Sequence, residues 1–232
     1  MIKQAERTVK KLLEGGAPII VAYSGGKDSS IVLNLTLTMA AELKREGYEP
    51  PKIIVTHGNT GIENPEVVLH AKDEMHKVQK YAGKHGLRVQ ILVSHPALND
   101  QWAVRVIGRR NLPTYANSKY RACTVDLKIK PMQRLVKTVY QDLVNETGKE
   151  PVFLLGVRFT ESASRSARMT ERGDSATETR IGKDGYTYLA PIADWSTETV
   201  WEYLSEARNA LRDTFSDFAE MFRIYAHSGG ST

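Results

Sequence analysis

The sequence predicts an α/β fold: a doubly wound, mostly parallel sheet with helices on both faces. Apolar runs of strand length alternate with segments of helical periodicity over residues 18–93, and this order is typical of parallel sheets. The composition, 41% hydrophobic and 25% charged over 232 residues, is sufficient for one substantial core. Ligands of such sheets bind at the carboxyl ends of the strands, so the loops there are the first candidates for a site.

Each element of the first half has a local signal. Residues 18–23 read as a short β-branched strand between glycine pairs, and residues 28–45 as a helix with apolar residues at helical spacing. Residues 52–56 are the second predicted strand. Residues 65–85 form a helix with proline in its first turn, and residues 88–93 form the third strand.

The pattern is looser in the second half. Helices are predicted over residues 99–110 and 127–145, separated by a loop, and a strand over residues 152–157. Residues 158–176 are rich in arginine and serine with few apolar anchors, which indicates a mobile loop. The Asp-Gly pair within residues 179–189 predicts a hairpin.

The end of the chain is predicted to be helical. One helix should begin at Thr197 and another near Thr214, with Trp195 and Trp201 in the core. We expect one domain over residues 1–204, followed by a helical extension and loose tail over residues 205–232.

Bulk properties narrow the protein class. The formal charge of +5 favours a polyanionic partner weakly. No stretch approaches the roughly 18 apolar residues of a membrane-spanning helix, so we expect a cytoplasmic protein without a membrane partner. Cys123 is the single cysteine, which excludes an internal disulfide and an iron-sulfur cluster held by four thiolates of this chain.

A phosphate-binding loop is the most specific motif. Ser24-Gly25-Gly26-Lys27-Asp28-Ser29 lies between a predicted buried strand and a helix. The glycines let backbone N–H groups approach an anion, the helix N-terminus adds partial positive charge, and Lys27 adds a full charge. The spacing differs from that of the Walker A motif. We expect this loop to hold phosphate groups.

The loop resembles the PP-loop of the adenine-nucleotide α-hydrolases, which have a Rossmann-like fold of the HUP type. Three further segments resemble the phosphoadenylyl-sulfate (PAPS) reductase-like branch of that superfamily. They are Gly156-Val157-Arg158 followed by Glu161-Ser162, Arg121-Ala122-Cys123-Thr124 ahead of Leu127–Pro131, and Pro191–Trp195. The matches follow one order over residues 18–204, so the resemblance rests on several independent segments.

The cysteine content separates the subfamilies. PAPS reductases carry a reactive cysteine near the C-terminus or paired cysteines, and this chain has neither, so sulfate reduction is disfavoured. The Cys-Thr-x-x-Leu-Lys-Ile-Lys-Pro segment at Cys123–Pro131 most resembles the cluster-free ATP pyrophosphatases of bacterial DNA phosphorothioation, an antiviral defence system. This resemblance implies cleavage of ATP to AMP and pyrophosphate, adenylation of a DNA phosphate, and DNA, a cysteine desulfurase and other phosphorothioation subunits as partners.

The resemblance also assigns roles to residues. Lys27, Asp28, Arg158 and Cys123 would be catalytic, with Asp28 placing Mg²⁺ and Arg158 clamping a phosphate unless it is an ordinary surface arginine. Cys123 would carry a persulfide, favoured by positive charge nearby, although free cysteine is usually a small buried hydrophobe. The expected ATP contacts are Ala22, Tyr23, Ser24, Gly25, Gly26, Lys27, Asp28, Ser29, His57, Asn59, Thr60, Gly156 and Arg158.

DNA phosphates would meet arginines of the predicted loop and basic residues near Cys123. These are Arg165, Arg168, Arg172, Lys119 and Arg121. Each could equally be a solvated surface charge, and His57 could be a histidine satisfied at a strand end.

Two alternatives remain open from the sequence. One is another PP-loop enzyme, either a relative of the PAPS or adenylyl-sulfate reductases or a tRNA-thiolating adenylase. The other is an inactive ATP-sensing subunit, against which the intact Ser24, Lys27, Asp28 and Arg158 argue.

Overall fold

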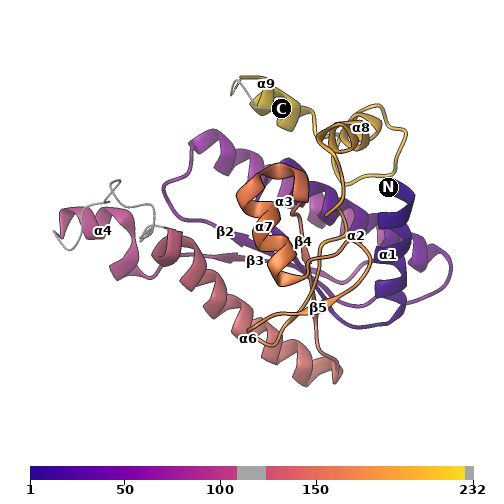
Figure 1. Ribbon diagram of the computed structural model, residues 1–232, viewed down its shortest axis with the longest axis horizontal. Coiled ribbons are helices and arrows are strands. Elements are labelled where there is room, and N and C mark those ends of the chain that lie inside the picture. Colours follow the sequence, from indigo (N-terminus) through magenta and orange to yellow (C-terminus); the bar gives the residue numbers. More distant parts are fainter. Residues whose placement is uncertain (109–123, 228–232) are drawn as a thin grey trace.

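A six-stranded sheet forms the centre of the molecule (Figure 1). The structure is a computed structural model that describes residues 1–108 and 124–227. The strand order is β3-β2-β1-β4-β6-β5, and all neighbouring pairs are parallel except β5 with β6. The strands are β1 Ile19–Tyr23, β2 Ile53–Gly58, β3 Val89–Ser94, β4 Val152–Leu155, β5 Arg180–Ile181 and β6 Thr187–Leu189. This confirms the predicted fold class and the hairpin.

Alternate residues of the central strands face two different helical layers. Ile19 and Val21 of β1 pack into the main core, whereas Ile20 packs into a smaller cluster on the other face. The main core contains residues of α1 Ile2–Glu14, α2 Lys27–Arg45, α3 Pro65–His85 and α8 Thr197–Arg208. The opposite cluster contains Val139 and Leu143 of α6 Lys130–Thr147. Figure 1 shows α6 on one side of the sheet, with α8 and α9 on the other.

The remaining helices are short. A 3₁₀ turn, η1 Leu98–Asp100, leads into α4 Trp102–Ile107, where the sequence predicts one helix. A π-helical turn, η2 Val125–Ile129, leads into α6. Among the described residues, none of the helices has the length and apolar content needed to cross a membrane.

Helix α1 is absent from the sequence-based prediction. Ala5, Val9 and Leu13 recur every fourth residue and are buried, and the helix packs against α2. This spacing is the usual signal of an amphipathic helix. No element is predicted from the sequence before residue 18.

The prediction of a loop over residues 158–176 is wrong. The segment contains the 3₁₀ turn η3 Phe159–Glu161 and the helix α7 Ala163–Arg172. The Ser162 hydroxyl caps α7 by accepting from the Arg165 N–H, and Gly173 ends it at φ 71°. Met169 is fully buried. One apolar anchor and two capping residues therefore suffice for a helix where composition indicated a loop.

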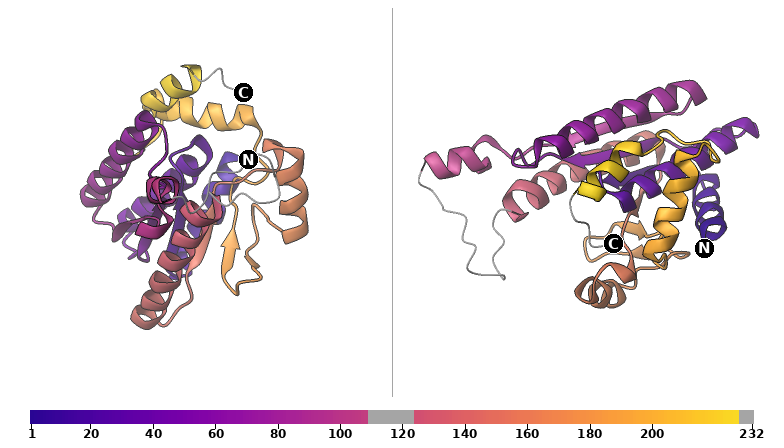
Figure 2. Two further views of the ribbon diagram at one scale, coloured as in Figure 1. Left: turned by 90° about the vertical axis from the view of Figure 1, so that its left-hand side faces the viewer. Right: turned by 90° about the horizontal axis from the view of Figure 1, so that it is seen from above.

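The C-terminal residues pack into the main core. Helix α8 begins at Thr197 as predicted, whereas α9 is Ala219–His227 and begins later than expected. Phe215, Phe218 and Met221 are buried in the same cluster as β1 and α2. Figure 2 shows α8 and α9 together on one side of the molecule. Trp195 is buried as predicted, and Trp201 is half-buried against α9.

Candidate functional site

The phosphate loop is held in shape by its own serines. Ser29 Oγ donates to the Gly26 carbonyl at 2.9 Å and accepts from the Ser24 N–H at 3.1 Å. The Ser24 and Ser29 hydroxyls lie 2.9 Å apart. Gly25 has a φ of 81°, which disfavours any residue with a side chain. The loop therefore presents a fixed turn at the N-terminus of α2, where backbone N–H groups and the helix dipole attract anions.

Gly156 lets the loop approach the neighbouring strand. A Cβ atom at Gly156 would lie 2.7 Å from Ser29 Cα and 2.8 Å from the Asp28 carbonyl carbon. These are backbone atoms of the first turn of α2, which cannot move without moving the loop. Gly156 therefore sets the position of the loop through close packing, whereas the sequence predicts a contact with the nucleotide.

Arg158 and Asp28 form a buried ion pair. Arg158 is 2% exposed, and its Nε donates to Asp28 Oδ1 at 2.7 Å. Its Nη1 donates to Thr160 Oγ1 at 2.9 Å and lies 3.4 Å from Thr197 Oγ1. Burial raises the pKa of Asp28, while the Arg158 and Lys27 charges oppose that rise. Arg158 is therefore not a surface arginine: it fixes the carboxylate beside the loop.

Lys27 lies under an aromatic ring from the end of the chain. Its Nζ is 4.8 Å from the centroid of the Tyr225 ring, a cation–π distance. The Tyr225 hydroxyl would lie 3.6 Å from a Cβ placed on Gly26. Helix α9 thus reaches the phosphate loop. The sequence offered one signal for this contact, the aromatic pair Phe222 and Tyr225 at helical spacing.

A cavity of about 870 Å³ opens beside the loop at the carboxyl ends of β1, β2 and β4. We call it the large cavity. Its volume is in the range of small-molecule sites. Five residues predicted to contact ATP line it: Ala22, Tyr23, Ser24, His57 and Asn59. Residues not predicted for the site also line it, including Lys128, Met132 and Val136 near the start of α6 and the aromatic residues Phe153, Tyr186 and Tyr188.

The sequence did not predict that α6 forms a wall of the large cavity. Met132 and Val136 are spaced for one helix face, and this spacing predicts burial but not the surface against which the face packs. Lys128 lies in the π-helical turn before α6, where the helical periodicity is interrupted.

His57 is held in one tautomer at the edge of the large cavity. Its Nδ1 lies 3.1 Å from the Tyr23 carbonyl, which can only accept, so Nδ1 carries the proton and Nε2 is the acceptor. Burial lowers the pKa of His57, so the ring is neutral near pH 7.

The loop after β2 is folded by its own side chains. The Thr60 N–H donates to both carboxylate oxygens of Glu63, at 3.0 and 3.1 Å, and Asn59 Oδ1 accepts from the Gly61 N–H at 2.9 Å. Asn59 and Glu63 line the large cavity, whereas Thr60 is not among the residues lining it.

The arginines predicted to bind nucleic acid lie on α7, where two of them have acidic partners. Arg165 pairs with Glu161, and Arg172 pairs with Asp174 at 2.7 Å. Arg168 is exposed and donates to the Ser164 carbonyl at 3.0 Å. None of the three lines the large cavity. Lys119, Arg121 and Cys123 lie outside the described residues.

Asp28 is the carboxylate within the phosphate loop itself. Residues 1–108 and 124–227 contain no group of three His, Cys, Asp or Glu side chains placed to hold a metal ion. A Mg²⁺ ion bound through one carboxylate and substrate phosphates is compatible with this arrangement, because Mg²⁺ commonly keeps several waters in such sites.

Comparisons with known proteins give the family. The pattern of the phosphoadenosine phosphosulfate reductase domain matches residues 18–212. The chain belongs to this family. The match confirms the resemblance to PAPS reductase-like PP-loop proteins.

Individual relatives are distant. The chain is 28% identical over 207 residues to the uncharacterized protein MJ0066 of Methanocaldococcus jannaschii, covering 88% of this chain and 33% of that protein. It therefore spans about a third of the length of this curated relative.

Two solved structures are similar to this chain at low TM-scores. The U34-tRNA thiolase NcsA of Methanococcus maripaludis, described with its [4Fe-4S] cluster, has a TM-score of 0.47 at 18% identity over 88% of this chain and 63% of that chain. The NAD⁺ synthetase of Burkholderia pseudomallei has a TM-score of 0.47 at 14% identity over 86% of this chain and 72% of that chain.

Proposed function

We propose that this chain is an ATP pyrophosphatase that activates a nucleic-acid phosphate for sulfur insertion. The observation that carries the proposal is the serine-braced glycine turn at the N-terminus of α2, open beside a cavity of about 870 Å³ at the strand ends. An anion site adjoining a cavity in the size range of small-molecule sites matches a ligand with phosphates at one end and a base at the other.

The residues divide between the two ends of ATP. The phosphates lie on the loop N–H groups of Gly25 and Gly26 and on the Lys27 ammonium. Adenosine lies in the large cavity, where backbone groups of Ala22 and Tyr23 meet the base and His57 Nε2 accepts a hydrogen bond. Mg²⁺, held by Asp28 and phosphate oxygens, would neutralise charge on the phosphates. Arg158 acts by orienting Asp28.

The first reaction is adenylation of a DNA backbone phosphate. An ionised oxygen of that phosphate forms a bond to the α-phosphorus of ATP, the bond from the α-phosphorus to its bridging oxygen breaks, and pyrophosphate leaves. No general base is needed, since the nucleophile is already ionised. The protein contributes alignment and charge neutralisation through the loop and Lys27.

The second reaction delivers sulfur from Cys123. A cysteine desulfurase charges this thiol as a persulfide. The terminal sulfur attacks the adenylated phosphorus, and AMP leaves with its oxygen. A thiol reductant then cleaves the sulfur–sulfur bond and is itself oxidised, which leaves sulfur on the phosphate. Thr124, the first described residue after Cys123 in the chain, lines the large cavity.

Turnover of α-labelled ATP tests the first reaction. We expect AMP and pyrophosphate from the wild type, and a loss of about a hundredfold or more in Lys27→Ala, by analogy with the removal of one transition-state donor. Lys84→Ala, at the far end of α3, is the matched control and should keep full activity. Formation of ADP and orthophosphate by the wild type would overturn the proposal.

Two further arms test the acceptor and the sulfur carrier. Duplex DNA should stimulate AMP release more than tRNA, and the reverse would favour a tRNA-thiolating adenylase. Cys123→Ala should retain pyrophosphate release and lose sulfur transfer to the acceptor. Equal loss of both activities would contradict the carrier role.

A further inference from the structure

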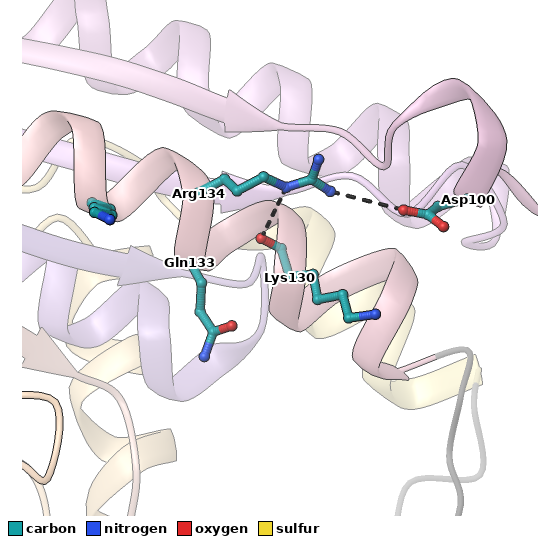
Figure 3. Close-up of a pocket in the computed structure, with 5 residues that line it drawn as sticks. Asp100, Lys130, Gln133 and Arg134 are labelled. Atoms are coloured by element: carbon teal, nitrogen blue, oxygen red, sulfur yellow. Dashed lines mark hydrogen bonds and ion pairs between the residues drawn. The ribbon is translucent and has the colours of Figure 1, made fainter.

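A second, shallower hollow lies on the flank of α6 (Figure 3). It has a volume of about 430 Å³ and is lined by Asp100 of η1 and by Lys130, Gln133, Arg134 and Lys137 of α6. Figure 3 shows Arg134 directed at Asp100, with Gln133 pointing away from it. Lys130, Arg134 and Lys137, which we call the basic row, share one helix face at i, i+4 and i+7 and span about 10 Å along the axis.

Positive charge exceeds negative charge in this hollow. Arg105 binds both nearby carboxylates, Asp126 at 2.7 Å and Asp100 at 2.9 Å. Lys130 also pairs with Asp126, at 2.7 Å. The contact of Arg134 with Asp100 is longer, at 3.9 Å. Within the described part of the chain, Lys137 forms no ion pair. The hollow and its neighbouring ion pairs thus contain two carboxylates and four cations, and the three cations of the basic row are exposed to solvent.

The basic row leads into the large cavity. Gln133 and Lys137 line both the hollow and the large cavity, so the two share a rim. The acidic residues of α6, Asp142 and Glu146, lie in its C-terminal half, away from this rim. A polyanion on the basic row would therefore continue over Gln133 toward the phosphate loop.

We propose that the basic row binds the phosphodiester backbone of the acceptor nucleic acid and guides it into the large cavity. This proposal rests on the proposed function, because it places the acceptor of that reaction. It shifts the nucleic-acid surface from α7, where Arg165 and Arg172 already pair with acidic residues, to the helix that forms the cavity wall.

Binding measurements in the absence of ATP test this surface. Fluorescence anisotropy with labelled duplex DNA, single-stranded DNA and tRNA compares the wild type with Arg134→Ala/Lys137→Ala. We expect affinity to fall about tenfold to a hundredfold at 0.1 M salt, and the salt-dependence slope to decrease by about 2, one for each phosphate contact. The nucleic acid that shows the largest loss identifies the acceptor.

Lys80→Ala/Lys84→Ala is the matched control, since it removes two exposed charges at i and i+4 on α3 at the opposite end of the sheet. It should bind like the wild type. Arg165→Ala/Arg168→Ala tests α7 and should change affinity less than the α6 variant. Circular dichroism melting verifies that each variant is folded.

Three results would overturn the proposal: no nucleic-acid binding by the wild type, unchanged binding by the α6 variant, or equal loss in the α3 control. These outcomes are independent of the products formed from ATP. If the wild type released ADP while binding nucleic acid through α6, the pyrophosphatase function would fail and the binding surface would stand.

Discussion

Gly156 sets the position of the phosphate loop at the scale of one residue. The first turn of α2 passes so close to it that a side chain has no room. The contact joins the residue after β4 to the residues after β1, two strands that are parallel neighbours in the sheet. The position of the loop therefore depends on this close contact between backbone segments, in addition to the hydrogen bonds made by the side chains of the loop.

Gly156→Ala should displace the start of α2. The added Cβ meets backbone atoms, and overpacking of this kind typically costs about 1–3 kcal/mol. We expect a lower free energy of unfolding in urea and weaker ATP binding by calorimetry. Gly83→Ala is the control, because its Cβ would meet nothing within 4 Å and alanine favours the helix. Equal stability of the two variants would contradict the packing role.

The buried Asp28–Arg158 ion pair contributes both to the geometry of the candidate site and to the stability of the fold. Breaking a buried pair leaves one charge without its partner, at a typical cost of about 3–5 kcal/mol. Substitution of either residue therefore changes the fold as well as the site. Activity loss in such variants has to be read together with their free energies of unfolding.

His57 should make stability depend on pH in a defined direction. Burial lowers its pKa below the ordinary value of about 6.5, so the unfolded chain binds the proton more readily. The contribution is fully present above that value and is lost as pH falls through the lowered pKa. The stability of the wild type relative to His57→Gln should therefore decrease on acidification, measured by urea unfolding across this range. Parallel pH profiles would contradict it.

At the scale of elements, α9 connects the C-terminal residues to both the core and the site. Met221 is 1% exposed in the main core, and Tyr225, one turn later, lies over Lys27. The position of the Tyr225 ring over Lys27 therefore depends on how α9 packs in the main core.

Met221→Ala should destabilise the protein. Truncation of a buried methionine typically costs about 2–5 kcal/mol, and the loss should appear as a lower midpoint in urea. Leu211→Ala is the matched control in the same segment, since Leu211 is 74% exposed and its truncation should be nearly neutral. A Met221 variant as stable as the wild type would show that α9 does not pack as described.

At the scale of the whole molecule, one core joins the two ends of the described chain. The main cluster includes Val9 of α1, Val21 of β1 and Phe218 before α9. We expect one cooperative unfolding transition, with coincident curves from far-ultraviolet circular dichroism and tryptophan fluorescence. Two separated transitions would indicate that the C-terminal residues form an independent unit.

The fold was largely predictable because its signals are local. The parallel strands are short apolar runs between glycines and helices, and each can be read within about ten residues. The exceptions have physical reasons. Helix α7 depends on the burial of Met169 and on two caps, and α1 carries its apolar residues among many charges.

The candidate site was predictable only in part. The loop motif located Ser24 to Ser29, and the strand ends located His57 and Asn59 beside the same cavity. The wall formed by α6 and the ring of Tyr225 were not predicted, because helical spacing shows which face is buried and not what it faces.

The parallel α/β class, the glycine turn before α2 and the family could all be read from the sequence, because each is encoded in contiguous residues. Tertiary structure alone decided that Arg158 meets Asp28, 130 residues away, and that α9 reaches Lys27. It also decided that the basic row of α6 shares a rim with the large cavity. These contacts join residues that are far apart in the sequence. They depend on which strands pair and which face of the sheet each helix covers, and no local sequence pattern specifies either.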